Sequence, residues 1–428
     1  FDANTPFPGV HALVPTVGTV LIILFGTRST WVGRLLSIPF MVTVGLVSYS
    51  AYLWHQPLFA FARIRLLNEP GAAVYLALSA LAIVLAYLSW RYVEAPFRNR
   101  RNFSRPQVFT MAIVASGVLI AVGLAGHVAG GFQGRLSEGA TAMLAYREDR
   151  GELRDFCDAG VGDYQVPAER CTVGADTDPT IAIVGDSHAR ELAWFLGEAA
   201  ATEGLSAKVL VYSSCPPIRG VRRIDLAQDN CPRNNDDVFA YLRDSDDISH
   251  VVLAARWTLY LETDRFDNGE GGVEHGDPFF VAPIDVPIPA VNRALVRRTL
   301  PDLIVQSIEE LLAADKTVIV VYPVPEVGWN VPEYLARAEM YGEARDAGLS
   351  TSYARFKERN ELALATLDSL GERDGLIRVR PHEIFCDSAI SGRCLAQDGG
   401  LPLYFDDDHL NSVGAEPVVE RILEHVTP

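Results

Sequence analysis

The chain has 428 residues, of which 49% are hydrophobic, and a formal net charge of −17 at pH 7. This length allows a large buried core and more than one domain. The acidic balance argues against a general nucleic-acid-binding protein, because such proteins present basic surfaces to the phosphate backbone.

Apolar runs fill roughly the first 130 residues, and each approaches the ~20 residues that a membrane-spanning helix needs. Buried helices of a soluble protein would give a similar pattern, but four such runs in succession favour a membrane. We therefore predict a membrane α-helical segment at 1–130 with about four transmembrane helices. The candidate spans are 11–27, 38–62, 72–93 and 108–129.

Arginine residues are unevenly distributed between these spans, and cytoplasmic loops of membrane proteins carry an excess of positive charge. Two loops are therefore expected in the cytoplasm, and residues beyond 130 outside it. Arg63 and Arg65 lie on the outer side and reduce the contrast. The arginines of the two cytoplasmic loops are Arg28, Arg34, Arg91, Arg98, Arg100, Arg101 and Arg105.

The six cysteines lie outside the predicted spans and follow one another in neighbouring pairs. An oxidising compartment would convert them to three short-range disulfides. Reduced structural cysteines are the alternative, whereas a zinc site is disfavoured because no CxxC or paired-His spacing accompanies them. The candidate pairs are Cys157 with Cys171, Cys215 with Cys231, and Cys386 with Cys394.

Residues 131–175 read as a linker with an entry helix, and 176–428 as a globular domain. Apolar strand patterns alternate there with helical patterns, which predicts a three-layer α/β domain with a parallel sheet. The segment 258–296 is long and rich in Gly, Pro and acidic residues, so we expect an excursion beside the site. Strands are predicted at 180–185, 208–214, 250–257, 316–323 and 376–381, and helices at 188–203, 234–244, 297–315, 352–370 and 412–426.

The sequence TIAIVGDSHAREL at 180–192 passes from a strand pattern directly into a helical pattern. A serine at such a junction is most often an N-cap, whose oxygen accepts a backbone hydrogen bond. However, Ser187 would also stand at the carboxyl end of a central strand, where α/β sheets bind ligands and amide groups can stabilise an oxyanion. Ser187 is therefore a candidate nucleophile, with the helix cap as the alternative.

Near the C-terminus, YFDDDHLNS places Asp406 three residues before His409. At this spacing in a turn, a carboxylate can reach the imidazole and select its tautomer, while the other ring nitrogen faces a hydroxyl. The alternatives are a solvated acidic turn in which Asn411 or Ser412 caps the last helix, and a metal site made from the Asp run. The combination with Ser187 favours acyl chemistry, and we predict no metal.

The globular domain resembles the SGNH (GDSL-like) esterase and acyltransferase superfamily. GDSH at 185–188 matches the family's nucleophile block, and Asp406 with His409 matches its DxxH block. The resemblance implies Ser187 as nucleophile, His409 as general base and Asp406 as the residue that orients His409. Asp407 and Asp408 lack the family's spacing, so we expect them to be polar groups of the loop.

The family's other oxyanion blocks are replaced here by SSCPP at 213–217 and LAARW at 253–257. The candidates for stabilising an oxyanion are therefore the Ser187 amide and Arg256. Arg256 could equally be a structural ion-pair residue. His188 and Trp257 are candidate substrate-binding residues, with a core position as the alternative for Trp257.

The membrane half resembles the last helices of the acyltransferase family 3 membrane domain. The similarity lies in FPGVHALVPTVGTVLI at 7–22, SYSAYLWHQPLF at 48–59 and SWRYVEAPFR at 89–98. That family's earlier helices are not in this sequence, so we expect a piece of a longer protein. A kink-stabilising role is preferred for His55, which adjoins Pro57, and an interfacial ion pair for Glu94.

Together the two resemblances imply a bacterial O-acetyltransferase that modifies lipopolysaccharide O-antigen, exopolysaccharide or peptidoglycan. Its expected partners are the lipid bilayer, a glycan acceptor and an acyl donor, with acetyl-CoA as the donor, no tightly bound cofactor and no nucleic acid. The expected location is the inner membrane, with the C-terminal domain in the periplasm or outside the cell. A membrane-anchored acetylesterase and a non-catalytic glycan-binding protein are the alternatives.

Overall fold

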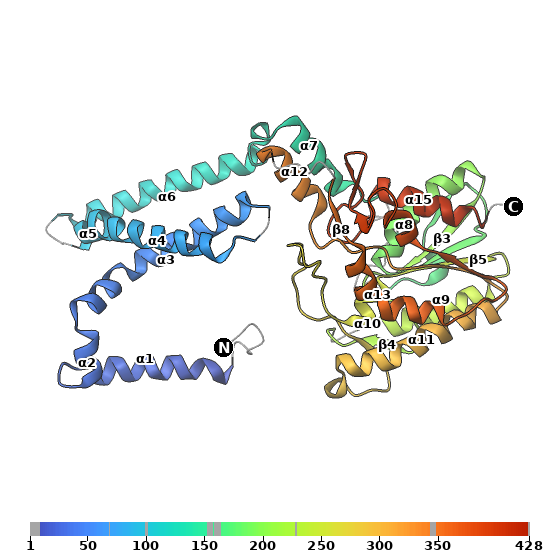
Figure 1. Cartoon of the computed structure of the whole chain (residues 1–428), viewed down its shortest axis with the longest axis horizontal. Helices are drawn as coiled ribbons and strands as arrows, with labels where there is room; N and C mark the ends of the chain where they lie inside the picture. The colour runs from blue at the N-terminus through green and yellow to red at the C-terminus, as the bar shows by residue number, and fades with distance from the viewer. Residues whose placement is uncertain are drawn as a thin grey trace. The chain divides into compact units, whose positions relative to one another are not determined.

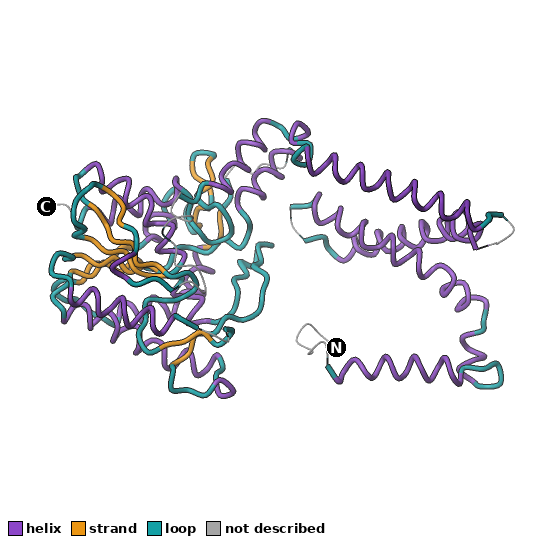
Figure 2. The backbone as a smooth tube through the Cα atoms, turned by 180° about the vertical axis from the view of Figure 1, so that it is seen from behind, coloured by secondary structure: helices purple, strands orange, loops and turns teal. Residues whose placement is uncertain are grey.

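The computed structural model describes residues 9–67, 69–98, 102–151, 157, 164–226, 229–342 and 348–426. The chain divides into two units, Phe1–Phe132 and Gln133–Pro428. Helices make up the first unit, whereas the second combines helices with strands (Figures 1 and 2).

Helices cover all four apolar runs of the first unit. The longest is α3, in which Ser50, His55 and Gln56 interrupt the apolar sequence. The helices are η1 (Val10–Ala12), α1 (Leu13–Phe25), α2 (Trp31–Leu36), α3 (Pro39–Arg65), α4 (Ala72–Ser89), the π-helical turn η2 (Trp90–Glu94), α5 (Ala95–Arg98) and α6 (Arg105–Val128).

Fewer helical stretches have the length and composition of a membrane span than the four that were predicted. Among the described residues, two helical stretches are long and apolar enough to cross a bilayer, Ala72–Arg98 and Arg105–Val128. The apolar stretch Val10–Phe25 is shorter. Large apolar side chains are exposed along α6, such as Leu119 at 72%, which suits lipid surroundings better than water. The prediction of about four transmembrane helices is therefore not confirmed.

Polar side chains of the first unit bond to one another between α3 and the stretch that follows α4. Ser50 donates to Glu94, and Trp54 Nε1 donates to Ser89 Oγ at 2.8 Å. His55 Nδ1 hydrogen-bonds the Tyr52 carbonyl within its own helix at 2.7 Å. Such internal partners lower the cost of polar groups in an apolar helix, and they agree with a structural role for His55.

A six-stranded sheet lies at the centre of the second unit, with the strand order β1-β3-β2-β5-β7-β9. All of the neighbouring pairs are parallel except β1 with β3. The predicted mostly parallel α/β sheet is confirmed, and each of the five predicted strands is present. Their bounds are β1 (Thr172–Gly174), β2 (Ile181–Gly185), β3 (Ser206–Val211), β5 (His250–Ala254), β7 (Thr317–Val321) and β9 (Leu376–Val379).

Helices cover both faces of this sheet (Figure 1). On one face, α8 (Ser187–Thr202) packs against the strands and against α15 (Ser412–Leu423). The other face carries α9 (Cys231–Asp244), α10 (Trp257–Glu262), α11 (Arg293–Ala313) and α13 (Tyr353–Asp368). The parallel strands are buried on both sides, as their continuous Val and Ile runs require.

A large apolar cluster lies between the sheet and the second group of helices. Leu210, Val251 and Val320 point from the strands toward Phe239 of α9 and Ile304 of α11, and each of these side chains is at most 1% exposed. Burial of a side chain of this size contributes about 1.5–3 kcal/mol, so this layer holds the strands in register. The carboxyl ends of the strands are thereby placed side by side.

The remaining elements include several that the sequence patterns did not predict. The expected linker contains α7 (Glu138–Ala145), which packs against α12 (Val331–Tyr341), and ends in the edge strand β1. The described part of the unit also contains three short antiparallel pairs, a short α14 and further 3-10 turns. They are β4 (Val221–Arg223) with β6 (Val281–Pro283), β8 (Ser350–Ser352) with β10 (Arg393–Leu395), β11 (Gln397–Asp398) with β12 (Leu401–Pro402), α14 (Pro381–Phe385), η3 (Gln133–Arg135), η4 (Tyr146–Glu148), η6 (Pro167–Glu169) and η7 (Ile288–Ala290).

All three predicted disulfides are present: Cys157–Cys171, Cys215–Cys231 and Cys386–Cys394. The second one joins the loop after β3 to the first residue of α9, and both of its cysteines are buried.

We expect the double substitution of Cys215 and Cys231 to Ser to lower the free energy of unfolding by about 3 kcal/mol, the contribution of a cross-link that closes a loop of this length. Thermal unfolding of the detergent-solubilised chain would measure the loss. An unchanged melting temperature would contradict this contribution.

Candidate active site

Ser187 is the first residue of α8 and follows β2 after a sharp turn. The helix cap is Asp186, whose Oδ1 accepts the His188 amide at 2.8 Å. Its Oδ2 accepts the Arg256 amide at 3.0 Å and the Tyr260 hydroxyl at 2.6 Å. Asp186 therefore joins the end of β2 to the end of β5 and leaves the Ser187 hydroxyl free of the capping role.

Gly185 makes this turn possible because its backbone has φ +152°, a value that residues other than glycine rarely adopt. A Cβ at this position would lie 1.8 Å from the Ala254 carbonyl oxygen of β5 and 2.8 Å from Ala189 Cβ. The turn therefore requires glycine for both its conformation and its space.

We expect Gly185→Ala to destabilise the chain by about 3 kcal/mol, the upper range for an overpacked site. Thermal unfolding would show the change. Gly134→Ala is the control, because a Cβ there meets nothing within 4 Å. Equal melting temperatures for the two variants would contradict the steric argument.

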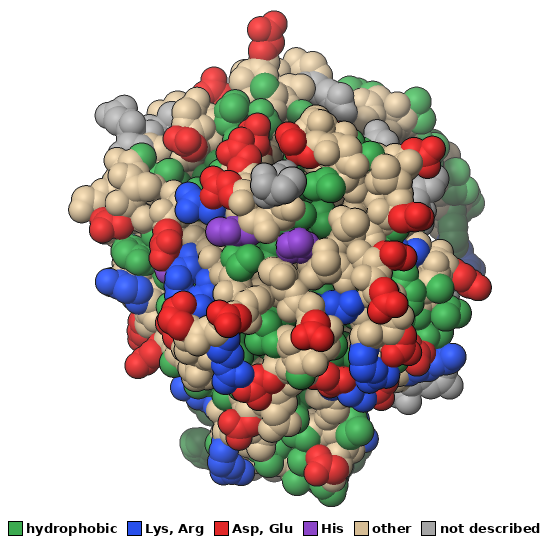
Figure 3. Space-filling model, turned by 90° about the vertical axis from the view of Figure 1, so that its right-hand side faces the viewer, with side chains coloured by type: hydrophobic (Ala, Val, Ile, Leu, Met, Phe, Trp, Pro, Cys, Tyr) green, Lys and Arg blue, Asp and Glu red, His purple; other side chains and the backbone are tan. Residues whose placement is uncertain are grey.

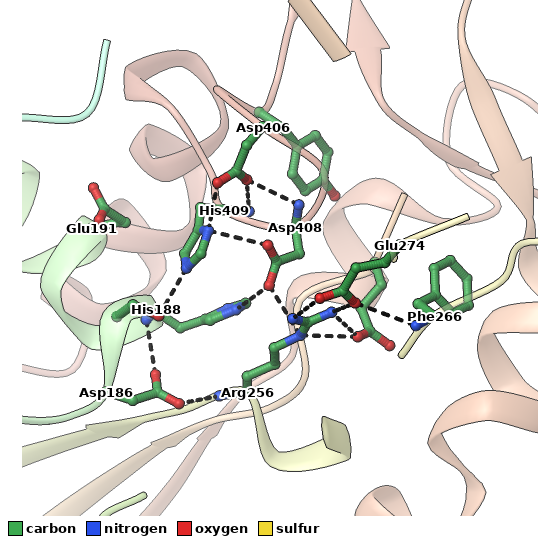
Figure 4. Close-up of polar contacts among 12 residues, drawn as sticks. Asp186, His188, Glu191, Arg256, Phe266, Glu274, Asp406, Asp408 and His409 are labelled. Atoms are coloured by element: carbon green, nitrogen blue, oxygen red, sulfur yellow. Dashed lines mark hydrogen bonds and ion pairs between the residues drawn. The ribbon is translucent and has the colours of Figure 1, made fainter. Parts of the chain in front are cut away.

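The three residues predicted as a triad lie in hydrogen-bonding contact. His409 Nε2 is 2.8 Å from Ser187 Oγ, and His409 Nδ1 is 2.8 Å from Asp406 Oδ2. The other Asp406 oxygen accepts the backbone amides of His409 at 2.8 Å and Asp408 at 3.1 Å. Asp406 thus shapes the loop and orients the ring (Figure 4). A ring nitrogen that faces a serine hydroxyl in this way can accept its proton.

Asp408 also belongs to the site, contrary to the expectation of a polar loop group. It is 3% exposed, and its Oδ1 lies 3.1 Å from His409 Nδ1. Its Oδ2 lies 3.0 Å from His188 Nε2 and 3.0 Å from Arg256 Nε (Figure 4). The DxxH spacing singles out Asp406, and no sequence signal distinguishes a buried Asp408 from a solvated one.

Arg256 is surrounded by carboxylates. This supports a structural ion-pair role over the alternative role in stabilising an oxyanion. Its guanidinium contacts Glu274 at 2.6 Å, Glu326 at 2.6 Å and Asp408 at 3.0 Å, and the side chain is 10% exposed. Arg359 supplies a second cation to Glu326 at 2.8 Å. Because its nitrogens face these carboxylates, Arg256 is not poised as an oxyanion donor. Glu274 lies within the predicted excursion 258–296.

The two predicted substrate-binding residues, Trp257 and His188, are both buried. Trp257 is 1% exposed, and its Nε1 donates to the Val321 carbonyl at 2.9 Å. This satisfied indole is a core residue and presents no face to a sugar. His188 is 6% exposed and packs against His409, with ring centroids 4.8 Å apart. His188 therefore helps to hold the His409 ring in place.

The charges of the site shift the proton affinity of three neighbouring groups. Burial would lower the pKa of His409, but the Asp408 and Asp406 carboxylates raise it well above its usual value. Burial would raise the pKa of Asp408, but Arg256 and His409 hold it well below its usual range. Burial and the adjacent Asp408 and Asp406 raise the pKa of Asp407 to about 7. The imidazole thus lies in a strongly anionic environment.

The SSCPP loop follows β3 and so lies next to the strand that leads to Ser187. Ser214 adopts φ +59°, an unusual backbone conformation for a residue other than glycine. Arg190 Nη1 donates to Ser213 Oγ at 2.8 Å, and Cys215 is held by its disulfide. Arg190 itself is buried on α8, where it pairs with Glu191 at 2.7 Å. The loop is therefore anchored to the helix that carries Ser187.

Two groups of ligand-type atoms in the described residues approach one another within 4.8 Å: His188, Asp408 and His409, and the run Asp406 to Asp408. The Arg256 guanidinium already supplies the positive charge at Asp408. A metal ion there would be repelled by it, so the arrangement fits an ion-pair network better than a metal centre.

On the face drawn in Figure 3, acidic and basic side chains are interspersed, unlike a continuous basic nucleic-acid surface.

Comparison with known proteins finds relatives that match part of this chain. Over 123 residues, the chain is 32% identical to a protein named "Putative O-acetyltransferase" in Staphylococcus aureus strain COL, and 31% identical to one of the same name in strain MRSA252. The match covers 27% of this chain and only 20% of each relative.

Two solved structures match part of this chain. The periplasmic domain of a Salmonella ser. Paratyphi A lipopolysaccharide acetyltransferase is 16% identical, with a TM-score of 0.39, over 59% of this chain and 86% of that chain. A "putative acylhydrolase" from Bacteroides fragilis is 11% identical, with a TM-score of 0.28, over 60% of this chain and 89% of that chain.

The model of one family, described as the SGNH domain fused to AT3 domains, matches residues 156–424. This range includes the turn that carries Ser187 and the loop that carries His409. The chain therefore belongs to the family of SGNH domains that are fused to AT3 domains, as its sequence motifs predicted.

Proposed function

We propose that this protein is an O-acetyltransferase that moves an acetyl group onto a hydroxyl of an extracytoplasmic glycan through an ester on Ser187. The observation that carries the proposal is the contact of His409 Nε2 with Ser187 Oγ at 2.8 Å, with Asp406 on the other ring nitrogen. Membership of a family of SGNH domains fused to AT3 domains supports an acyl group as the cargo.

In the first half-reaction, the Ser187 oxygen attacks the acyl carbonyl while His409 takes its proton. The bond to the leaving group breaks, and the leaving group receives that proton from His409. The sugar hydroxyl then attacks the serine ester and loses its proton to the same imidazole. Ser187 departs, regains the proton and is ready for another cycle. The amide groups at the start of α8 are suited to stabilising the oxyanion of each step.

The cellular arrangement is part of the proposal. We propose that the second unit lies outside the cytoplasm, which its three disulfides support, since disulfides persist in oxidising compartments. Apolar helices of the first unit, such as α6, would anchor it in the inner membrane. Acetyl-CoA in the cytoplasm is the proposed source of the acyl group. The proposed acceptor is a surface or wall polysaccharide.

The test compares the O-acetyl content of isolated surface glycan from cells that express the protein with that from cells that express Ser187→Ala. We expect the variant to lose glycan acetyl groups. Ser388→Ala, which removes an exposed hydroxyl of the same unit, is the control. A gain of acetyl groups in Ser187→Ala would instead indicate an acetylesterase. No change would contradict a nucleophilic role and favour glycan binding without catalysis.

A further inference from the structure

The histidine of the site has two carboxylates at one nitrogen, whereas a serine triad needs one. His409 Nδ1 lies 2.8 Å from Asp406 and 3.1 Å from Asp408. Both distances are within reach of a single N–H that is shared between two acceptors. We propose that Asp408 is a second acid of this site, a positioning residue that holds the His409 ring together with Asp406. The inference rests on His409 serving as the general base, as proposed above.

The two carboxylates differ in their surroundings, which gives them different tasks. The Asp406 side chain is 27% exposed, and its second oxygen is used by backbone amides of its own loop. The Asp408 side chain is 4% exposed, and its second oxygen is held by His188 of α8 and by Arg256. Asp406 therefore organises the loop locally. Asp408 ties the loop to the elements that carry Ser187 and follow β5.

His188 connects Asp408 to the turn that carries the nucleophile. His188 is the next residue after Ser187, and its Nε2 hydrogen-bonds Asp408 at 3.0 Å. The same carboxylate reaches His409, whose other nitrogen faces Ser187. Ser187 thus contacts His409, His409 contacts Asp408, and Asp408 contacts His188, which is bonded to Ser187 in the chain. These contacts fix the separation of Ser187 and His409, which is the distance that proton transfer depends on.

The electrostatic contribution of Asp408 follows from its burial, because solvent screens a buried charge less than an exposed one. The titratable groups in contact with His409 are Asp406 and Asp408 from its own loop and His188 from α8, with Arg256 acting on Asp408 from the turn after β5. Of these, Asp408 and Asp406 stabilise the protonated imidazole directly. Each should therefore support the imidazolium that forms when Ser187, and later the sugar hydroxyl, gives up its proton to His409.

The first experiment measures ester turnover by the detergent-solubilised chain with p-nitrophenyl acetate as the probe. Loss of a sole triad carboxylate costs on the order of 10,000-fold in kcat. With two acids present, we expect Asp406→Asn to lose at most about 100-fold, and the double variant Asp406→Asn/Asp408→Asn to lose the full ~10,000-fold. A 10,000-fold loss in Asp406→Asn alone would overturn the proposal. Asp406→Asn leaves the ion pairs of Arg256 unchanged. The result for this single variant can therefore be interpreted even if Asp408→Asn fails to fold.

The second experiment follows the pH dependence of kcat/KM, because a purely structural role would not move it. The neutral imidazole is the active base, so activity rises with pH through the pKa of His409. Removing the Asp408 charge destabilises the imidazolium, and we expect Asp408→Asn to shift the rising limb to lower pH. Asp407→Asn, the same change in the adjacent residue, is the control. An unmoved limb in Asp408→Asn, or an equal shift in both variants, would overturn the proposal.

A third measurement separates this inference from the proposed function. The titration of His409 is observed by NMR on histidine-labelled chain, with His409→Gln used to assign its signal, and it requires no turnover. If Ser187→Ala kept full ester turnover, the proposed function would fail. A lowered His409 pKa in Asp408→Asn would still support Asp408 as an acid of this histidine. An unchanged titration with an inactive Ser187→Ala would refute the second acid and leave the proposed function standing.

Discussion

We expect His409→Ala to reduce the rate of Ser187 acylation by on the order of 10,000- to 1,000,000-fold, the loss found when a serine triad is deprived of its base. Without the imidazole, the hydroxyl proton has no acceptor at the 2.8 Å contact with Ser187 Oγ. Single-turnover reaction of the detergent-solubilised chain with p-nitrophenyl acetate would measure the rate, with the acyl-enzyme detected by mass spectrometry.

The matched control is His425→Ala, which removes an exposed histidine beyond α15. It should acylate at the rate of the unmodified chain and melt at the same temperature. A His409→Ala variant that acylated at this same rate would show that the base is another group. It would also remove the main support for the proposed chemistry.

The largest loss of stability is expected from Arg256→Ala, at about 3–5 kcal/mol. This substitution leaves Glu274, Glu326 and Asp408 close together without the cation that they share. A buried charge whose partner is removed keeps its desolvation cost and loses its compensation. For a unit of this size, the change corresponds to a melting temperature lower by about 10 °C.

Arg219→Ala provides the comparison, because Arg219 also contacts two carboxylates but its side chain is 40% exposed. Exposed ion pairs contribute about 0–1 kcal/mol, so its melting temperature should change little. Thermal unfolding of both variants at neutral pH in the same detergent tests the difference. Similar losses in the two variants would mean that burial does not govern the strength of the Arg256 network.

Much of the architecture could be predicted because the local sequence periods are strong. The apolar run before Ser187 became β2, and the amphipathic pattern after it became α8, with bounds within a residue or two of the prediction. The edge strand β1 was not predicted, because three residues that pair antiparallel with β3 have too little pattern of their own. The four-span prediction is not confirmed, since polar residues break the apolar run of α3 and this helix lacks the composition of a span.

The site was predictable where one short motif carries both partners. Asp406 and His409 are three residues apart, so the turn between them brings the carboxylate to the ring whatever the rest of the fold does. The ion-pair network was not predictable in this way. Arg256, Glu274 and Glu326 are far apart in the chain, and they meet only because β5 and β7 end at the same edge of the sheet.

The sequence by itself determined the family, the succession of the central strands and helices along the chain, and the candidate residues Ser187, His409 and Asp406, since each depends on local spacing and side-chain type. Only the tertiary structure decided that Asp408 and His188 contact the His409 ring, that Trp257 is a core residue and that Arg256 contacts three carboxylates. The physical reason is burial. The environment of a charge or ring depends on which distant segments cover it, and that follows from the packing of the whole sheet.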